Sequence, residues 1–161
     1  MKSAFGLFLL LAGLVALDRF TKLMMIARPL SSGPFLFPGA FEFTHHQNFG
    51  IIANIPVPLF LIVAISVIIL ILVAFGFIRA IRRRERREAA ALTLIFAGAI
   101  GNLWDRIQWH FVFDWILLFG RSAINLADVM IGIGIIWYLV DRERDNRRKE
   151  PSDTQTLDTS S

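Results

Sequence analysis

The chain has 161 residues, of which 55% are apolar and 19% are charged, and its formal net charge is +4. Soluble domains carry about a quarter charged residues, and the mean hydropathy here is +0.59, which excludes an ordinary soluble domain. The absence of cysteine excludes disulfides, thiolate catalysis and cysteine-ligated metals. Because the basic residues lie between long apolar runs, the composition predicts a membrane protein and no nucleic-acid partner.

The first predicted membrane span covers residues 3–26. Its purely apolar part, residues 3–17, is short for a hydrocarbon core about 30 Å thick. Asp18 and Lys22 lie four residues apart and can pair on one helical face, which allows the helix to continue. A cleaved signal peptide is the alternative interpretation, but no small-x-small cleavage site follows Leu17.

The first connection, residues 28–56, carries proline and glycine punctuation. Aromatic and polar residues alternate along residues 41–44 (FEFT). This pattern predicts a short twisted strand pair at the membrane surface, a small β-element between the first two helices.

Three further spans are predicted over residues 58–78, 89–104 and 123–140. The connection over residues 105–122 is dense in aromatic residues, which is typical of the headgroup level. Ala97, Gly101, Ala123 and Ala127 are small enough to let the third and fourth helices approach closely. We therefore expect one all-α membrane domain over residues 1–149 and a disordered cytoplasmic tail over residues 150–161.

The arginines and lysines predict the orientation of these spans. Twelve of the seventeen basic residues lie before the first span, between the second and third spans, or after the fourth. Cytoplasmic connections carry the excess of basic residues. Both termini are therefore expected in the cytoplasm, with two connections facing outward.

Acidic residues are rare at membrane depth, because each needs a partner or a function there. Leaving the cytoplasmic side aside, they lie near the outer ends of the predicted spans and in the outer connections. They are Asp18, Glu42, Asp105, Asp114 and Asp128. An ion or proton carrier would place carboxylates near the midplane, whereas this distribution favours a site at the outer interface.

Asp114 lies in an apolar segment with no adjacent cation, so desolvation is expected to raise the pKa of its carboxyl group. Asp128 follows shortly after a possible turn at Gly120 and Arg121. Two aspartates that share one proton would form an aspartic-protease dyad, in which one activates water and the other polarises the scissile carbonyl.

Other interpretations of the polar residues remain open. The aspartates could only pair with Arg106, Arg121 and Lys22 to hold helix ends together. A zinc site is disfavoured because the three histidines have no ligand spacing. A serine–lysine hydrolase is disfavoured because Asp18 is the expected partner of Lys22, the lysine on the outer side. Asp105, next to Arg106, is expected to support the site.

Five short motifs, in this order, resemble those of the lipoprotein signal peptidase (signal peptidase II) family. They are residues 18–22 (DRFTK), 48–50 (NFG), 98–106 (GAIGNLWDR), 112–115 (VFDW) and 125–128 (NLAD). The resemblance covers nearly the whole chain before the tail. It implies a four-helix, multi-pass enzyme of the bacterial cytoplasmic membrane, with both termini inside and its active site at the outer face.

The resemblance also implies an aspartic endopeptidase. Its substrate would be a prolipoprotein whose cysteine carries a diacylglyceryl group, and the cut would fall just before that cysteine. The implied partners are this substrate and membrane lipid. The resemblance implies no cofactor and no metal. Asp114 and Asp128 would be catalytic. The implied supporting residues are Asp18, Lys22, Asn48, Gly50, Asn102, Asp105, Arg106 and Asn125. A small ion- or proton-coupled membrane protein using the same carboxylates is the alternative.

Three departures from the family pattern concern the surface that would cover the substrate. Residues 51–53 (IIA) differ from the usual continuation after the NFG motif, and Ile124 stands where phenylalanine is common. The segment joining Asp114 to Asp128 is also shorter than expected. These differences leave room for an altered substrate preference.

Overall fold

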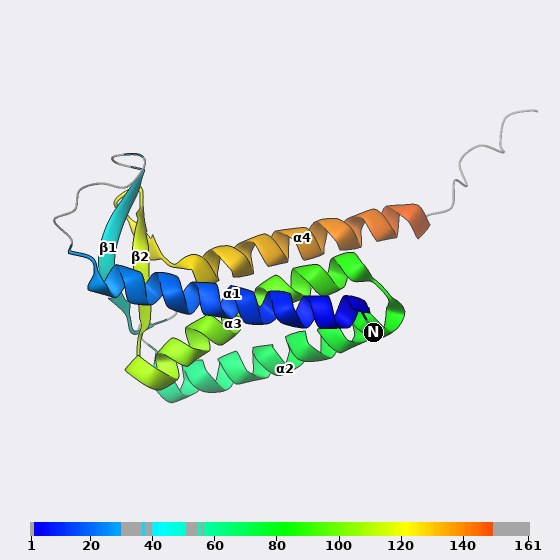
Figure 1. The fold of residues 1–161 in the computed structure, drawn as a ribbon, viewed down its shortest axis with the longest axis horizontal. Helices are drawn as coiled ribbons and strands as arrows, with labels where there is room; N and C mark the ends of the chain where they lie inside the picture. Colours follow the sequence, from blue (N-terminus) through cyan, green and yellow to red (C-terminus); the bar gives the residue numbers. More distant parts are fainter. Residues whose placement is uncertain (1, 30–36, 38–39, 51–54, 56, 150–161) are drawn as a thin grey trace, which may run out of the picture.

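The computed structural model describes residues 2–29, 37, 40–50, 55 and 57–149. These residues form a mostly helical protein with a small antiparallel sheet. The helices are α1 (Lys2–Ala27), α2 (Leu59–Arg83), α3 (Arg86–Trp109) and α4 (Leu126–Lys149). The strands are β1 (Phe41–Asn48), β2 (Val112–Leu118) and β3 (Ser122–Ile124). The helices lie side by side along the long axis, and the sheet lies across one end of them (Figure 1).

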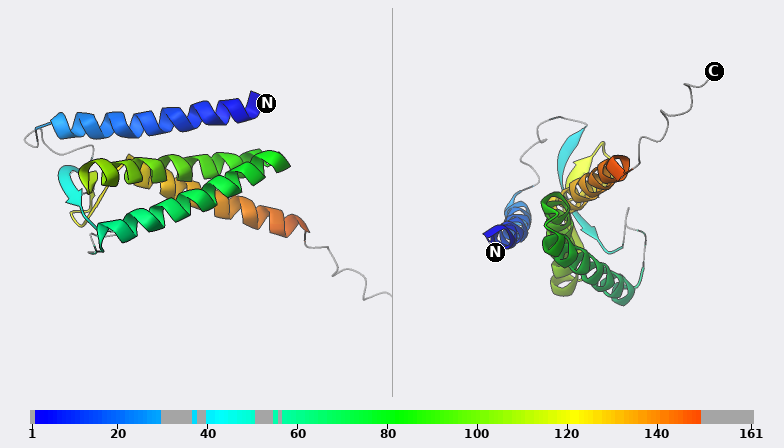
Figure 2. Two further views of the ribbon diagram at one scale, coloured as in Figure 1. Left: turned by 90° about the horizontal axis from the view of Figure 1, so that it is seen from below. Right: turned by 90° about the vertical axis from the view of Figure 1, so that its right-hand side faces the viewer.

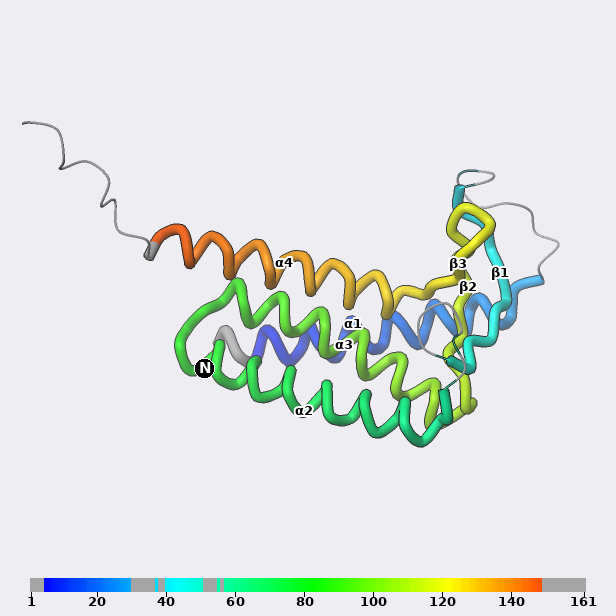
Figure 3. The backbone as a smooth tube through the Cα atoms, turned by 180° about the vertical axis from the view of Figure 1, so that it is seen from behind, coloured from blue at the N-terminus to red at the C-terminus, as the bar shows by residue number. Residues whose placement is uncertain are grey.

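The start of α1, the connection between α2 and α3, and the end of α4 all lie at the end of the molecule opposite the sheet (Figures 1 and 3). This is the end that carries most of the basic residues, including the six arginines of residues 79–87. Asp105, Asp114 and Asp128 instead lie in the parts of α3, β2 and α4 that are at the sheet end of the molecule. Basic residues are therefore concentrated at the end of the molecule opposite the sheet.

Helix α3 is the centre of the bundle, since it contacts α1, α2 and α4. Figure 2 shows α1 and α2 on different sides of it. Small residues make the α3–α4 contact close: Ala97 of α3 and Ala127 of α4 are fully buried in one cluster. A Cβ atom on Gly98 would collide with the main-chain oxygen of Ala127, so only glycine fits there.

Helix α2 carries the strongest membrane signal. Among the described residues it is the one helix long and apolar enough to cross a bilayer, with a mean hydropathy of 3.3 over its best window. Only Ile62 and Ala80 of α2 are buried, and large apolar side chains such as Phe60, Leu72 and Phe75 are exposed. An exposed apolar surface of this extent fits contact with lipid rather than with water.

The sheet corrects one sequence prediction. A strand does form over Phe41–Asn48, but it pairs with β2, from the connection between α3 and α4, in the antiparallel order β1-β2-β3. The second connection was expected only to lie at the headgroup level. Its VFDWILL segment is rich in residues that suit both a strand and an apolar interface, so periodicity could not separate the two. The sheet therefore joins both connections.

The start of the fourth helix also differs from the prediction. The fourth span was expected to begin at Ala123, but Ala123 and Ile124 belong to β3, and α4 begins at Leu126. Phe119 and Gly120 form the tight turn between β2 and β3, with φ of 49° and 62°. The predicted disordered tail and the atypical residues 51–53 lie outside the described residues.

Candidate active site

A buried ionic cluster joins α1 to α3 near the sheet. The Lys22 ammonium lies 2.9 Å from the carboxylate of Asp18 and 2.7 Å from that of Asp105. All three side chains have no exposed surface, and Arg19 completes the cluster with a 2.5 Å pair to Asp105. Because buried charges are stable only when paired, this cluster holds α1 in one position against α3.

The two acids of this cluster also bind backbone amides of other elements. Asp18 accepts a hydrogen bond of 3.1 Å from the N–H of Ala127, in the first turn of α4. Asp105 accepts one of 3.4 Å from the N–H of Phe113 in β2. A carboxylate at a helix N-terminus satisfies an otherwise unpaired donor and interacts favourably with the helix dipole. The cluster thus orients the two segments that carry Asp114 and Asp128.

Asp114 lies on β2 with 1% of its surface exposed. One carboxyl oxygen accepts a 2.7 Å hydrogen bond from Asn125, and the other accepts a 3.2 Å bond from Asn48 of β1. Burial raises the pKa of Asp114 to about 7, and the nearby charge of Asp128 acts in the same direction. The two asparagine hydrogen bonds oppose this rise.

Asp128 lies in the first turn of α4, not five residues into a span as the sequence suggested. Its carboxylate accepts a 3.1 Å bond from the N–H of Asn125, and its own N–H donates to the Asn125 side-chain oxygen at 3.1 Å. This reciprocal pair is a capping box, and it determines the orientation of the Asp128 side chain at the start of α4.

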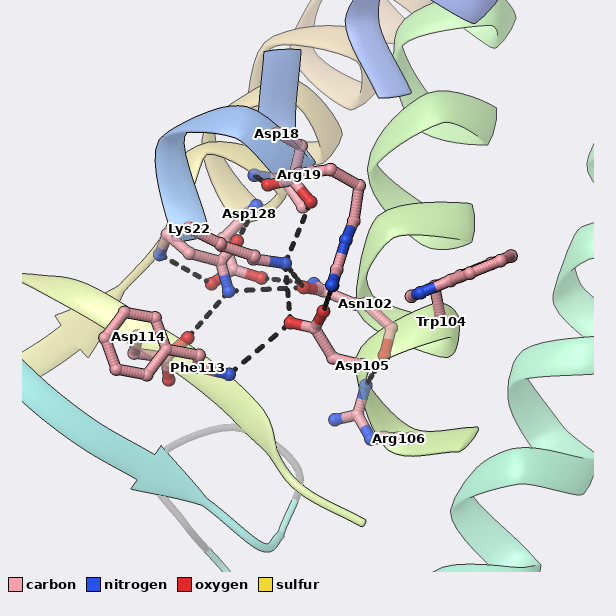
Figure 4. A network of polar contacts seen from close by, with 12 residues as sticks. Asp18, Arg19, Lys22, Asn102, Trp104, Asp105, Arg106, Phe113, Asp114 and Asp128 are labelled. Atoms are coloured by element: carbon pink, nitrogen blue, oxygen red, sulfur yellow. Dashed lines mark hydrogen bonds and ion pairs between the residues drawn. The ribbon is translucent and has the colours of Figure 1, made fainter. Parts of the chain in front are cut away.

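Two asparagine amides connect Asp114 to Asp128. Asn102 of α3 donates to Asp128 at 2.7 Å and accepts from Asn125 at 3.2 Å, while Asn125 also donates to Asp114. Lys22 donates to the same Asn102 oxygen at 3.3 Å. Figure 4 shows both carboxyl groups turned toward this network. Among the described residues, neither Asp114 nor Asp128 forms an ion pair.

A cavity of about 400 Å³ opens beside this network. Its charged and amide side chains come from Asn48, Asn102, Arg106 and Asp128. Its other walls include all of β3 together with Ile131 and Gly132 of α4. Asp128 therefore meets the cavity directly, while Asp114 lies behind it and reaches it through its partner Asn48.

Arg106 holds the segment that follows β1 against α3. Its guanidinium donates to the main-chain oxygen of Gly50 at 3.1 Å and to that of Asn102 at 3.3 Å. Gly50 is buried, and its N–H donates to the Asn48 side-chain oxygen at 3.1 Å.

Ten residues predicted for the site thus come together. They are Asp18, Lys22, Asn48, Gly50, Asn102, Asp105, Arg106, Asp114, Asn125 and Asp128.

The ion pairs agree only in part with the alternative in which the aspartates hold helix ends together. Lys22 pairs with two of the aspartates, as that alternative expects. Asp105 pairs with Arg19 and Lys22 of α1 rather than with its neighbour Arg106. Arg19 was not predicted as a partner, although its position three residues before Lys22 places both on one side of a helix. The wall formed by β3 was also missed, because its three residues carry no chemical signal of their own.

Metal ligands do not gather in the described part of the chain. No group of three or more histidine, aspartate or glutamate side chains there could hold a metal ion. His45 instead contacts the main-chain oxygen of Met25 at 2.7 Å, at the end of α1. His46 lies opposite Asp114 in the β1–β2 register.

Comparison with known proteins places these features in a family. The family model described as signal peptidase (SPase) II matches residues 10–142. A lipoprotein signal peptidase of Geobacter sulfurreducens is 33% identical, over 94% of this chain and 100% of that protein. One of Syntrophus aciditrophicus is 34% identical, over 92% of this chain and 99% of that protein.

Two solved structures, each titled as a bacterial membrane enzyme, share the fold. One has a TM-score of 0.78 and 24% identity, covering 93% of this chain and 94% of that chain. The other has a TM-score of 0.73 and 26% identity, covering 87% and 94% respectively.

Proposed function

The chain belongs to the signal peptidase II family, and from this premise we propose that it removes signal peptides from diacylglyceryl-modified prolipoproteins as an aspartic endopeptidase. Cleavage occurs just before the lipid-modified cysteine. The observation that carries this proposal is the pair Asp114 and Asp128, which come from different elements and are joined by a network of amides. Asp128 lines the cavity, and Asp114 lies behind it.

The environments of the two aspartates support different roles. Asp114 is buried, and the rise of its pKa to about 7 favours the protonated form, which can donate a hydrogen bond to the scissile carbonyl oxygen. Asp128 lines the cavity and accepts hydrogen bonds on both oxygens, so it is the carboxylate that acts as general base.

In the proposed reaction, Asp128 takes a proton from a water molecule while the oxygen of that water attacks the carbonyl carbon. Asp114 gives its proton to the carbonyl oxygen, and a tetrahedral intermediate forms. When the intermediate collapses, the carbon–nitrogen bond breaks and the amine of the cysteine takes the proton held by Asp128. One hydroxyl group of the intermediate returns its proton to Asp114 as the new carboxyl group forms. Asn102 and Asn125 hold both carboxyl groups in place through these steps.

The other network residues act by positioning. Lys22, Asp18 and Asp105 hold α1, α3, β2 and α4 together at the site, while Asn48 binds Asp114 directly. Arg106 and Gly50 connect α3 to the segment after β1, next to the cavity where the peptide would bind. None of these groups needs to exchange a proton with the substrate.

We also propose four membrane crossings, with both termini in the cytoplasm of a bacterium and the site at the outer face of the inner membrane. Three observations support this. The basic residues lie at the end opposite the sheet, α2 exposes apolar side chains along its length, and the helices lie side by side (Figure 1). Lipid and signal helix would then both deliver the scissile bond to the sheet end.

The test is incubation of the purified protein in detergent with a synthetic lipopeptide that contains a diacylglyceryl-modified cysteine. Mass spectrometry should show one cut, just before that cysteine. Asp114→Asn and Asp128→Asn should each lower the rate about 10²–10⁴-fold, while Asp145→Asn, at an exposed position of α4, should retain full activity.

Full activity of either site variant would show that the two aspartates are not the catalytic pair. Ion flux through proteoliposomes without any cleavage would instead favour a small ion- or proton-coupled membrane protein.

A further inference from the structure

Strand β3 is an edge strand. It pairs with β2 on one side, through Ile124 with Ile116 and Ser122 with Leu118, and no strand lies on its other side in the three-stranded sheet. In an antiparallel edge strand, alternate residues direct both N–H and C=O away from the partner. Apart from the pairing with β2, no described residue makes a hydrogen bond with the backbone of these three residues.

This unpaired edge borders the cavity that contains Asp128. Ser122, Ala123 and Ile124 all line it, and Asp128 follows Ile124 by four residues on the same segment. Unpaired backbone groups of this kind are usually avoided or covered. Here they lie next to the proposed general base, where a substrate backbone has to pass.

We propose that the polypeptide around the scissile bond binds in an extended conformation as a fourth strand, paired with β3. This inference rests on the proposed function. The added strand would lie about 4.8 Å from β3, and the three residues of β3 offer about 10 Å of pairing. Main-chain hydrogen bonds would supply affinity that does not depend on the side chains of the substrate. They would also hold each carbonyl group of the substrate at a defined place along the cavity.

The surroundings of β3 favour a single extended chain as the occupant. The cavity is walled on other sides by Ile131 and Gly132 of α4 and by Arg106 of α3. This leaves a concave slot of about 400 Å³, which suits one backbone and not the sheet of a second copy. A Cβ atom added to Gly132 would meet nothing within 4 Å, so this wall leaves space for the chain.

The first test is a scan of the lipopeptide substrate in which single residues before the cleavage site carry a backbone N-methyl group. A methyl group removes one donor and adds bulk, so at positions that pair with β3 it should lower kcat/KM about tenfold or more. At the positions between, kcat/KM should change less than about threefold. A flat profile, or a loss without alternation, overturns the inference.

The second test fills the slot from the protein side. Gly132→Leu should raise KM for the lipopeptide about tenfold or more, because the new side chain occupies the place of the added strand. Gly13→Leu is the matched control, because that glycine of α1 also has open space around it, and its KM should stay unchanged. An unchanged KM in Gly132→Leu overturns the inference.

Amide hydrogen exchange separates this inference from the proposed function. With the inactive Asp114→Asn variant, binding of the uncut lipopeptide should slow exchange in residues 122–124 about tenfold or more and leave the outer edge of β1 unaffected. If the wild-type protein never cleaves the lipopeptide, the proposed function fails. If it cleaves but residues 122–124 gain no protection in the variant, pairing with β3 fails alone.

Discussion

At the scale of one residue, the surroundings of Asp114 determine the pKa of its buried carboxyl group. Desolvation penalises its charged form, and the charge of Asp128 adds to this penalty. Asn125 and Asn48 reduce the penalty by donating to its two oxygens. The balance keeps the pKa near neutrality, which suits a group that must donate a proton and then recover it.

The pH dependence of cleavage should report this balance. The proposed mechanism needs Asp114 protonated, so kcat/KM should fall as the pH rises above about 7. Asn48→Ala removes a hydrogen bond that favours the ionised form, and its falling limb should therefore move to higher pH. A rate profile measured between pH 5 and 9 checks both statements, with Asn146→Ala in the exposed part of α4 as the control. Activity that stays constant to pH 9 would contradict the assigned role.

Lys22 of the buried cluster is expected to contribute far more to the free energy of unfolding than a lysine in a surface ion pair does. Lys22→Met leaves Asp18 and Asp105 buried without their common cation, so the free energy of unfolding should fall by about 3–5 kcal/mol. The pair Glu143–Arg147 has the same i,i+4 spacing but lies at the surface. Arg147→Met should therefore cost less than about 1 kcal/mol. Thermal unfolding in detergent compares the two variants, and equal losses would show that burial of the cluster contributes nothing.

At the scale of the elements, the contact between α3 and α4 decides whether the two aspartates meet. Asn102 reaches Asp128 only because the helix backbones come close at Gly98 and Ala127. The turn at Phe119 and Gly120 then reverses the chain, so that β3 pairs with β2 and leads into α4. This brings Asp128 of α4 close to Asp114 of β2. Each of these contacts depends on small or specially folded residues.

The glycine at the closest point of this contact can be tested directly. In Gly98→Ala the new methyl group would meet the main-chain oxygen of Ala127, and backbone cannot move aside cheaply. The loss of stability should be about 1–3 kcal/mol, accompanied by reduced cleavage. Gly13→Ala, with open space around its Cβ, should be neutral or slightly stabilising because alanine favours the helix. Melting temperatures that rise equally in both variants would mean that the two helices do not approach this closely in the folded protein.

At the scale of the whole molecule, the uneven distribution of basic residues gives the protein two unlike ends. Basic residues gather at one end, while the cavity, the sheet and the aspartate network lie at the other. Positive residues are retained on the cytoplasmic side of a membrane. The orientation of the whole protein therefore decides which compartment the cavity faces.

Because the natural chain has no cysteine, single cysteines can report this orientation. Arg121→Cys, in the turn between β2 and β3, should react with a membrane-impermeant maleimide in intact spheroplasts. Arg86→Cys, at the first residue of α3, should react only after the membrane is permeabilised. Labelling of both positions, or of the second alone, in intact spheroplasts would refute the proposed topology.

The helices, the polar residues of the site and the family resemblance could all be predicted from the pattern of residues along the chain. Apolar runs define helices because a helix satisfies its own backbone bonds, and acids surrounded by apolar residues stand out because their burial is costly. Asp18 and Lys22 were predicted to pair from spacing alone, and they do. Such signals are local, or come from the cost of placing charge in lipid, so they can be read along the chain.

The pairing of strands and of charged side chains could be learned from the folded structure alone. Strand β1 pairs with a strand 64 or more residues later in the chain. Asp105 pairs with Arg19 and not with its neighbour Arg106, and Asp128 belongs to a capping box rather than to the interior of a helix. An apolar strand and an apolar interface have the same composition, and ion pairs depend on which helix faces which. These choices follow from packing among elements distant in sequence, which no local pattern records.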